Sequence, residues 1–127
     1  MDKAALVTAD FAVGAKLLDV LDNADLAISV ALWVNLPEYE DWRLVLSSRR
    51  LDTVNPLGAY GLVHDALERA EFPLEHTPPI LILRMTDPFI KALRQLFGKA
   101  RSVEGMRLGG QMIGDRFVDD ALVLRIR

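Results

Sequence analysis

The stretch that most constrains the fold is Ala27–Arg50, where two runs rich in leucine, valine and tryptophan flank a short segment containing proline and acids. Runs of this composition form strands, and Pro37–Asp41 between them has the composition of a connection. We therefore predict one long antiparallel β-hairpin. A five-residue connection sets Leu36 opposite Trp42.

This connection also predicts which side chains share a face of the hairpin. One face carries the pairs Leu36/Trp42, Val34/Leu44, Leu32/Leu46 and Val30/Ser48, and the other carries Asn35/Arg43, Trp33/Val45, Ala31/Ser47 and Ser29/Arg49. A slip by one residue would place the arginines among apolar side chains, which is costly for an unpaired charge. We therefore expect this register, or one shifted by an even number of residues.

The second face combines a tryptophan with polar residues, and two interpretations of it stay open. Either a helix or the C-terminal arm covers Trp33, or the face is an exposed platform for a partner. Tryptophan and arginine are enriched at binding hot spots, which favours an interface. The platform would consist of Trp33, Asn35, Arg43, Val45 and Arg49.

Length and composition are those of a small globular protein. We predict one domain over residues 1–127, long enough to bury a core without a metal or a disulfide. Hydrophobic residues make up 51% and charged residues 26%, which is ordinary for a folded domain. The sequence has no cysteine. Disulfides, thiolate catalysis and cysteine-based zinc sites are therefore excluded, and a reducing compartment fits.

The charge and the apolar runs limit where this protein acts. The N-terminus has an acid at its second position and no long apolar run, so we expect no signal peptide. Leu26–Leu36 is too short to span a membrane. The net charge is −3, and no basic run exceeds the pair Arg49–Arg50. We therefore predict a cytoplasmic protein without a membrane partner, and nucleic-acid binding is unfavoured.

The remaining elements follow from apolar spacing and from helix caps. We predict helices over Thr8–Asn23, from Asn55-Pro56 to about Ala70, and from Thr86-Asp87-Pro88 to about Gly98. Ile80–Met85 is apolar on both alternations and is expected to be a central strand. The tail, Val103–Arg127, predicts a second hairpin that turns at Gly114-Asp115 or, less favoured, at Asp119-Asp120. Gly109-Gly110 indicates a bulge or a close backbone approach.

These elements define an α+β fold in the order αββαβαββ. We expect a two-layer sandwich in which about five strands form a mixed or antiparallel sheet, with three helices mostly on one face. The other face of the sheet would then be open. An open face would leave Trp33 exposed, in agreement with the platform interpretation.

The acids of the hairpin connection are the only candidates for a metal site. Carboxylates of Glu38, Glu40 and Asp41 could hold magnesium for phosphodiester hydrolysis. No acid is followed two positions later by lysine, so the pattern of restriction-type nucleases is missing. Acids in a connection more often keep a sheet edge soluble. We therefore assign no metal ligand and expect no cofactor.

Other side chains give no catalytic pattern. His64 and His76 lie at no spacing that joins them into a metal motif. Ser47-Ser48 lacks the glycine context of a nucleophile elbow. We therefore predict no catalytic residue. A basic stripe (Lys91, Arg94, Lys99 and Arg101) could touch phosphate, but such a stripe is typically a solvated helix face.

The sequence favours a non-catalytic, accessory or chaperone-like protein that works by protein–protein contact. We expect self-association through the hairpin platform, or a protein partner on the same surface. One alternative is a metal-dependent phosphodiesterase or hydrolase that uses the connection carboxylates. A second alternative is a nucleic-acid accessory protein.

Overall fold

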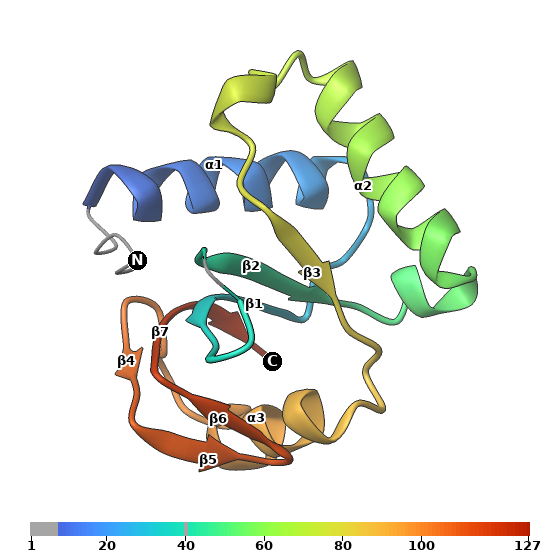
Figure 1. The fold of residues 1–127 in the computed structure, drawn as a ribbon. Coiled ribbons are helices and arrows are strands. Elements are labelled where there is room, and N and C mark those ends of the chain that lie inside the picture. Colours follow the sequence, from blue (N-terminus) through green and yellow to red (C-terminus); the bar gives the residue numbers. More distant parts are fainter. Residues whose placement is uncertain (1–7, 40) are drawn as a thin grey trace.

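The computed structural model describes residues 8–39 and 41–127, and these residues form the α+β fold that the sequence predicts (Figure 1). Three α-helices accompany a five-stranded mixed sheet and a separate two-stranded sheet. The helices are α1 (Thr8–Asn23), α2 (Pro56–Arg69) and α3 (Pro88–Phe97), with short 3₁₀ helices at Leu51–Thr53 and Leu74–His76. The strands are β1 (Val30–Asn35), β2 (Arg43–Ser47), β3 (Ile80–Ile82), β4 (Arg107–Leu108), β5 (Gln111–Ile113), β6 (Arg116–Val118) and β7 (Asp120–Ile126).

The starts of α2 and α3 are fixed by the caps expected from the sequence. The Asn55 side chain accepts a hydrogen bond of 2.7 Å from the backbone N–H of Gly58. The Asp87 carboxylate accepts one of 2.9 Å from the N–H of Phe89. A proline follows each cap at the first helical position, where the helix needs no N–H. The bounds of these two helices and of α1 agree with the predicted ones to within one residue.

The five strands lie in the order β3-β2-β1-β7-β4, with β1 in the middle. Strand β1 is antiparallel to both β2 and β7, and β2 is parallel to β3. The prediction that Ile80–Met85 is a central strand is wrong, because only Ile80–Ile82 is a strand and it lies at the edge. Its side chains are half-buried, packed alternately against the cores on the two faces of the sheet. The apolar run thus reflects two-sided packing at an edge.

The predicted hairpin is confirmed, but its register differs by one residue. Trp33 lies opposite Leu44 instead of Val45, and Leu32 lies opposite Val45. The prediction relied on the cost of placing Arg43 and Arg49 among apolar side chains. Both faces of the hairpin are buried in the structure. The contrast between polar and apolar side chains therefore does not select the predicted register over the observed one.

Arg43 shows why the other register is tolerated. It lies opposite Val34 at the first position of β2 and is half-buried. Its guanidinium carbon lies 4.1 Å from the centre of the Tyr39 ring. An arginine at a strand end can stack on an aromatic ring while its charge stays near solvent. The contact with the ring offsets part of the expected penalty, while Arg43 Nε stays buried without a hydrogen-bond partner in the described part of the chain.

The sheet is covered on both faces, so the prediction of an open face is wrong. Helices α1 and α2 cover one face, and α3 with the β5–β6 hairpin covers the other (Figure 1). The first core contains the sheet residues Ala31, Trp33, Leu44, Leu46 and Leu124, and the second contains Val30, Leu32, Val34, Val45 and Val123. Two of the three helices do share one face. The sheet nevertheless lies between two layers.

The C-terminal region forms more strands than predicted. Strands β4 and β7 pair with each other at the sheet edge, and β5–β6 is a second hairpin between them. The turn at Gly114-Asp115 is confirmed, with Gly114 at a φ of +61°. A Cβ atom at Gly114 would lie 2.5 Å from the Pro88 carbonyl oxygen. A Cβ atom at Gly109 would lie 2.8 Å from the carbonyl oxygen of Asp119. The close backbone approach expected at Gly109 is therefore also found.

Glycine at position 14 makes room for Trp33 beneath α1. A Cβ atom there would lie 2.7 Å from Trp33 Nε1 and 3.0 Å from Leu124 Cδ1. We expect Gly14→Ala to lower the free energy of unfolding by about 1–2 kcal/mol, because overpacking outweighs the gain in helix propensity. The matched control is Gly61→Ala, whose Cβ would meet no atom within 4 Å. We expect the control to raise stability by about 0.4–1 kcal/mol. Urea denaturation compares both, and equal effects would contradict the tight α1–Trp33 contact.

Candidate functional site

The five residues of the predicted platform do not form one surface. Trp33 and Val45 are buried in the cores on opposite faces of the sheet. Asn35 and Arg43 are half-buried near the ends of their strands, and Arg49 is exposed beyond the end of β2. The platform interpretation is therefore corrected: α1 covers Trp33, which was the other interpretation left open.

The described acids of the β1–β2 connection do not share a common partner. The Glu38 carboxylate lies 3.5 Å from the guanidinium of Arg116 on β6. Asp41 is exposed, and Glu40 lies outside the described residues. Across residues 8–39 and 41–127, no three acids or histidines lie close enough together to hold a metal ion. The metal hypothesis thus gains no support from this part of the chain.

The serines and histidines singled out in the sequence have structural surroundings. Ser48 is buried, and its hydroxyl accepts a hydrogen bond of 3.0 Å from the N–H of Leu51. Ser47 is also fully buried. His64 is exposed on α2, and His76 is exposed at the end of the second 3₁₀ helix. Neither serine hydroxyl is therefore accessible to a substrate.

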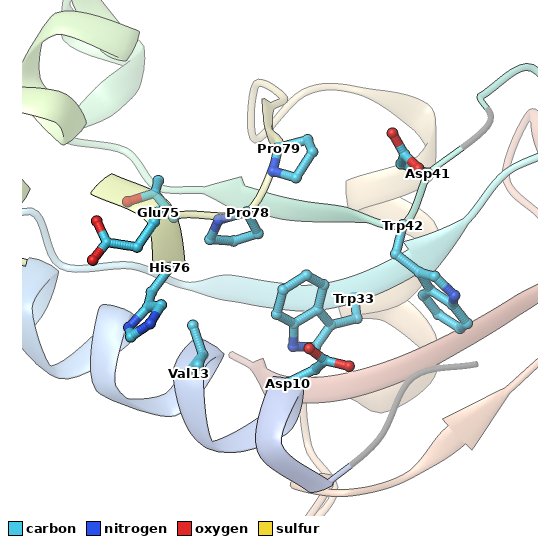
Figure 2. Close-up of a pocket in the computed structure, with 10 residues that line it drawn as sticks. Asp10, Val13, Trp33, Asp41, Trp42, Glu75, His76, Pro78 and Pro79 are labelled. Carbon is cyan, nitrogen blue, oxygen red and sulfur yellow. The ribbon is translucent and has the colours of Figure 1, made fainter. Parts of the chain in front are cut away.

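A cavity of about 440 Å³ lies beside the first turns of α1 and contains both tryptophans of the chain (Figure 2). We call it the Trp pocket. Its lining residues are Asp10, Val13, Trp33, Asp41, Trp42, Glu75, His76, Thr77, Pro78 and Pro79. In Figure 2, Trp33 lies near the centre of the group, with the two prolines above it and Asp10 below it. The pocket is therefore built around an aromatic floor.

Three separate segments hold the walls of the Trp pocket in place. The N-terminal part of α1 contributes one wall, the β1–β2 hairpin contributes the two indoles, and the loop before β3 contributes the third side. The backbone N–H of Leu44 donates a hydrogen bond of 2.8 Å to the carbonyl of Pro79, which fixes this loop on β2. Pro78 and Pro79 limit its backbone freedom. The walls thus rest on the sheet itself.

The polar groups of the Trp pocket are mostly acidic. The carboxylates of Asp10, Asp41 and Glu75 come from the three different segments, and His76 is the remaining ionisable residue of the lining. No lysine or arginine is among the described residues that line the pocket. The ionisable side chains among the described lining residues are thus three carboxylates and one imidazole.

Trp33 carries an unsatisfied donor in the wall of the pocket. Only 4% of this residue is exposed, and its Nε1 finds no acceptor in the described part of the chain. An indole N–H can only donate, and a buried donor without an acceptor is costly in free energy. This nitrogen lies against Gly14 of α1, where a Cβ atom would come within 2.7 Å of it, so it is not accessible from the cavity.

An ion pair away from the pocket supports the fold. Both terminal nitrogens of Arg125 on β7 donate hydrogen bonds of 2.8 Å to the Asp22 carboxylate at the end of α1. Arg125 also donates one of 3.1 Å to the carbonyl of Ile28. The hydrogen bonds from Arg125 lower the pKa of Asp22, and those to Asp22 raise the pKa of Arg125. The pair therefore ties α1 to the sheet.

This ion pair predicts a pH-dependent contribution to stability. Because folding lowers the pKa of Asp22 from its ordinary value of 3.8, the contribution is present above that value and is lost as the pH falls through the folded pKa. We expect Asp22→Asn to lower the free energy of unfolding by about 1 kcal/mol at pH 7, with the difference from wild type shrinking below about pH 4. Urea denaturation from pH 7 to 2 measures it, with exposed Asp65→Asn as the control. A difference that stays constant to pH 2 would contradict this role.

Comparison with known proteins assigns this chain to no family. No family model, curated protein or solved structure matches the chain. Within the described ranges, no helix is long and apolar enough to cross a membrane. Any assignment of function therefore depends on the site itself.

Few signals in the sequence indicate the Trp pocket. The predicted hairpin sets Trp42 opposite Leu36, and no element is predicted between about Ala70 and Ile80. Asp10, Asp41 and Glu75 are far apart in the sequence and share no motif. The one usable signal was Pro78-Pro79 directly before an apolar strand, which indicates a stiff segment but not its neighbours.

Proposed function

We propose that this chain is a non-catalytic binding domain that takes a segment of a partner protein in the Trp pocket. The observation that carries the proposal is the pocket itself, an open cavity of about 440 Å³ with indole and proline walls and a few polar groups. Cavities that bind ligands have volumes of about 300–1,000 Å³ and are lined mainly by apolar and aromatic side chains. Prolines and tryptophans together form surfaces suited to a polypeptide.

Several observations support a role in binding over one in catalysis. Ser47 and Ser48 are inaccessible, and Glu38 is engaged by Arg116. The side chain of Arg94 donates a hydrogen bond of 2.7 Å to the carbonyl of Arg127, so the basic stripe of α3 is partly used within the fold. No observation favours the metal-dependent or the nucleic-acid alternative. A cytoplasmic location remains part of the proposal, because a cysteine-free sequence suits a reducing compartment.

Self-association through the predicted platform is not part of this proposal. Trp33 and Val45 lie on opposite, covered faces of the sheet, so they offer no shared surface to a second copy. A protein partner remains the class of ligand that we propose, and its contact is moved from the sheet face to the Trp pocket. Light scattering on the chain alone shows whether a second copy is that partner.

The proposal predicts that peptides selected on the immobilised chain lose affinity when Trp42 is removed. We expect Trp42→Ala to weaken the binding of such peptides at least tenfold, because truncating a central aromatic contact removes much of the binding energy. The matched control is Leu57→Ala on α2, where 83% of the side chain is exposed and the pocket is not touched. The control should bind as wild type does.

A second variant separates binding from folding. Trp42 also packs against the core on the α1 side of the sheet, so circular dichroism must show that its variant is folded. His76→Ala changes an exposed side chain of the pocket, and we expect it to weaken the same peptides about fivefold. Peptides that bind both variants as tightly as wild type, or a selection that yields no binder, would overturn the proposal.

A further inference from the structure

We propose that the outer face of the β5–β6 hairpin is a second contact surface, which takes an extended, basic segment of a partner protein with an apolar residue at its centre. The hairpin covers one face of the five-stranded sheet, whereas α1, which borders the Trp pocket, covers the other (Figure 1). The inference is therefore independent of the pocket. It depends on an exposed apolar pair and on the charges beside that pair.

The apolar pair consists of Met112 and Phe117, which lie directly opposite each other on the two strands of the hairpin. Cross-strand partners share a face, and 61% of Met112 and 43% of Phe117 is exposed. The residues that follow them, Ile113 and Val118, are buried in the second core and turn the other face of the hairpin inward. Exposed methionine is frequent at surfaces that bind other proteins, because its side chain adapts to different partners. The pair therefore forms an apolar centre on the outside of the fold.

Two acids flank this centre along the chain. Asp115 and Asp119 stand two positions before and two positions after Phe117, and both are exposed. Across the described residues, no ion pair engages either carboxylate. We call Met112, Phe117 and these two aspartates the hairpin patch.

The arginines of the neighbouring strands do not neutralise the hairpin patch. Arg107 of β4 pairs with Asp120, and Arg116 of β6 pairs with Glu38. Their positive charges are thus already balanced by other acids. The patch presents uncompensated negative charge at both ends of an apolar centre.

These charges decide which occupant fits the hairpin patch. A second copy of the chain would bring the same two aspartates to the contact, and the phosphates of a nucleic acid are also negative, so both are repelled. A basic polypeptide is attracted. In an extended segment, residues two positions apart point to the same side. An apolar residue with lysine or arginine two positions before and after it therefore matches Phe117 between Asp115 and Asp119.

Nuclear magnetic resonance of the ¹⁵N-labelled full chain tests this inference with three peptides. The probe is acetyl-Lys-Thr-Phe-Thr-Lys-amide. The charge control has glutamate in place of both lysines, and the apolar control has serine in place of phenylalanine. We expect the probe to move the backbone amide signals of β5 and β6 and to bind at least about fivefold more tightly than either control peptide. The indole signals of Trp33 and Trp42 should stay in place, since both residues line the Trp pocket.

Variants of the hairpin patch should weaken the probe. We expect Phe117→Ala to weaken it at least about fivefold, and Asp115→Asn combined with Asp119→Asn about two- to fivefold. Circular dichroism checks that each variant is folded. The matched control is Leu96→Ala on α3, an exposed apolar side chain outside the hairpin, which should leave binding of the probe unchanged.

Three results would overturn the inference. The hairpin amides could stay in place at probe concentrations up to about 5 mM, which would exclude even weak binding. The three peptides could move them equally, which would remove the preference for basic and apolar residues. The hairpin signals could also depend on protein concentration without any peptide, which would make a second copy the occupant. Each of these leaves the proposed function standing, because binding in the Trp pocket is read from the indole signals.

Discussion

Trp33→Ala is expected to lower the free energy of unfolding by about 3–5 kcal/mol, and Trp33→Glu to abolish the folded state. Only 4% of Trp33 is exposed, and its ring lies in the core between β1 and α1, against Gly14. Alanine would leave a cavity under α1, and glutamate would bury a charge without a partner. Urea denaturation followed by circular dichroism measures both variants.

The outcome for Trp33→Glu separates the two interpretations of the hairpin face. Exposed Leu57→Ala is the control and should change stability by less than about 0.5 kcal/mol. A folded Trp33→Glu variant with the stability of wild type would mean that α1 does not cover this face. The platform interpretation would then be restored.

Phe89→Ala should have an effect of similar size from the opposite face of the sheet. Phe89 is 0% exposed and packs between α3 and the strands in the second core. We expect a loss of about 3–5 kcal/mol in the free energy of unfolding, because truncating a fully buried phenylalanine leaves a cavity. The measurement is urea denaturation followed by tryptophan fluorescence, since neither tryptophan is altered.

Leu96→Ala is the matched control for this second prediction. It lies on the same helix, but 64% of its side chain is exposed, so its loss should cost less than about 0.5 kcal/mol. Equal small effects from Phe89→Ala and Leu96→Ala would show that α3 does not seal the sheet. Together with Trp33, Phe89 therefore tests whether both faces are closed.

The local elements of this fold were predictable because their signals are local. Asn55-Pro56 and Asp87-Pro88 each combine a cap with a residue that needs no N–H, and each begins a helix. The turn at Gly114-Asp115 likewise depends on the backbone freedom of one glycine. Fold class followed from these elements. None of them depends on distant residues.

The register of the hairpin was mispredicted because it depends on what covers the sheet. An alternation of polar and apolar residues selects one register only when one face is wet. Here Trp33 and Val45 are both buried, on opposite faces, and Arg43 finds room above the Tyr39 ring. The sequence predicts α3 and the turn of the β5–β6 hairpin, but it carries no direct sign that they cover the second face of the sheet. The order of the strands in the sheet could not be predicted either, because β1 pairs with β7, which lies at the other end of the sequence.

The Trp pocket could not be assembled from the sequence for the same reason. Its walls come from α1, the β1–β2 hairpin and the loop before β3, and they meet only because β3 pairs with β2. Trp33 was correctly singled out as unusual, but for exposure that it does not have. Its unusual property in the structure is a buried indole N–H without an acceptor in the described chain.

Mapping a selected peptide onto the ¹⁵N-labelled wild-type chain tests the binding proposal most directly. We predict that both indole signals move, together with the backbone amides of Asp10, Val13, Glu75 and His76, and that signals from the rest of the chain stay in place. The opposite result would be unmoved indoles with changes around Met112 and Phe117, the exposed apolar pair of the β5–β6 hairpin. That outcome would place binding on another face and contradict the Trp pocket as the functional site.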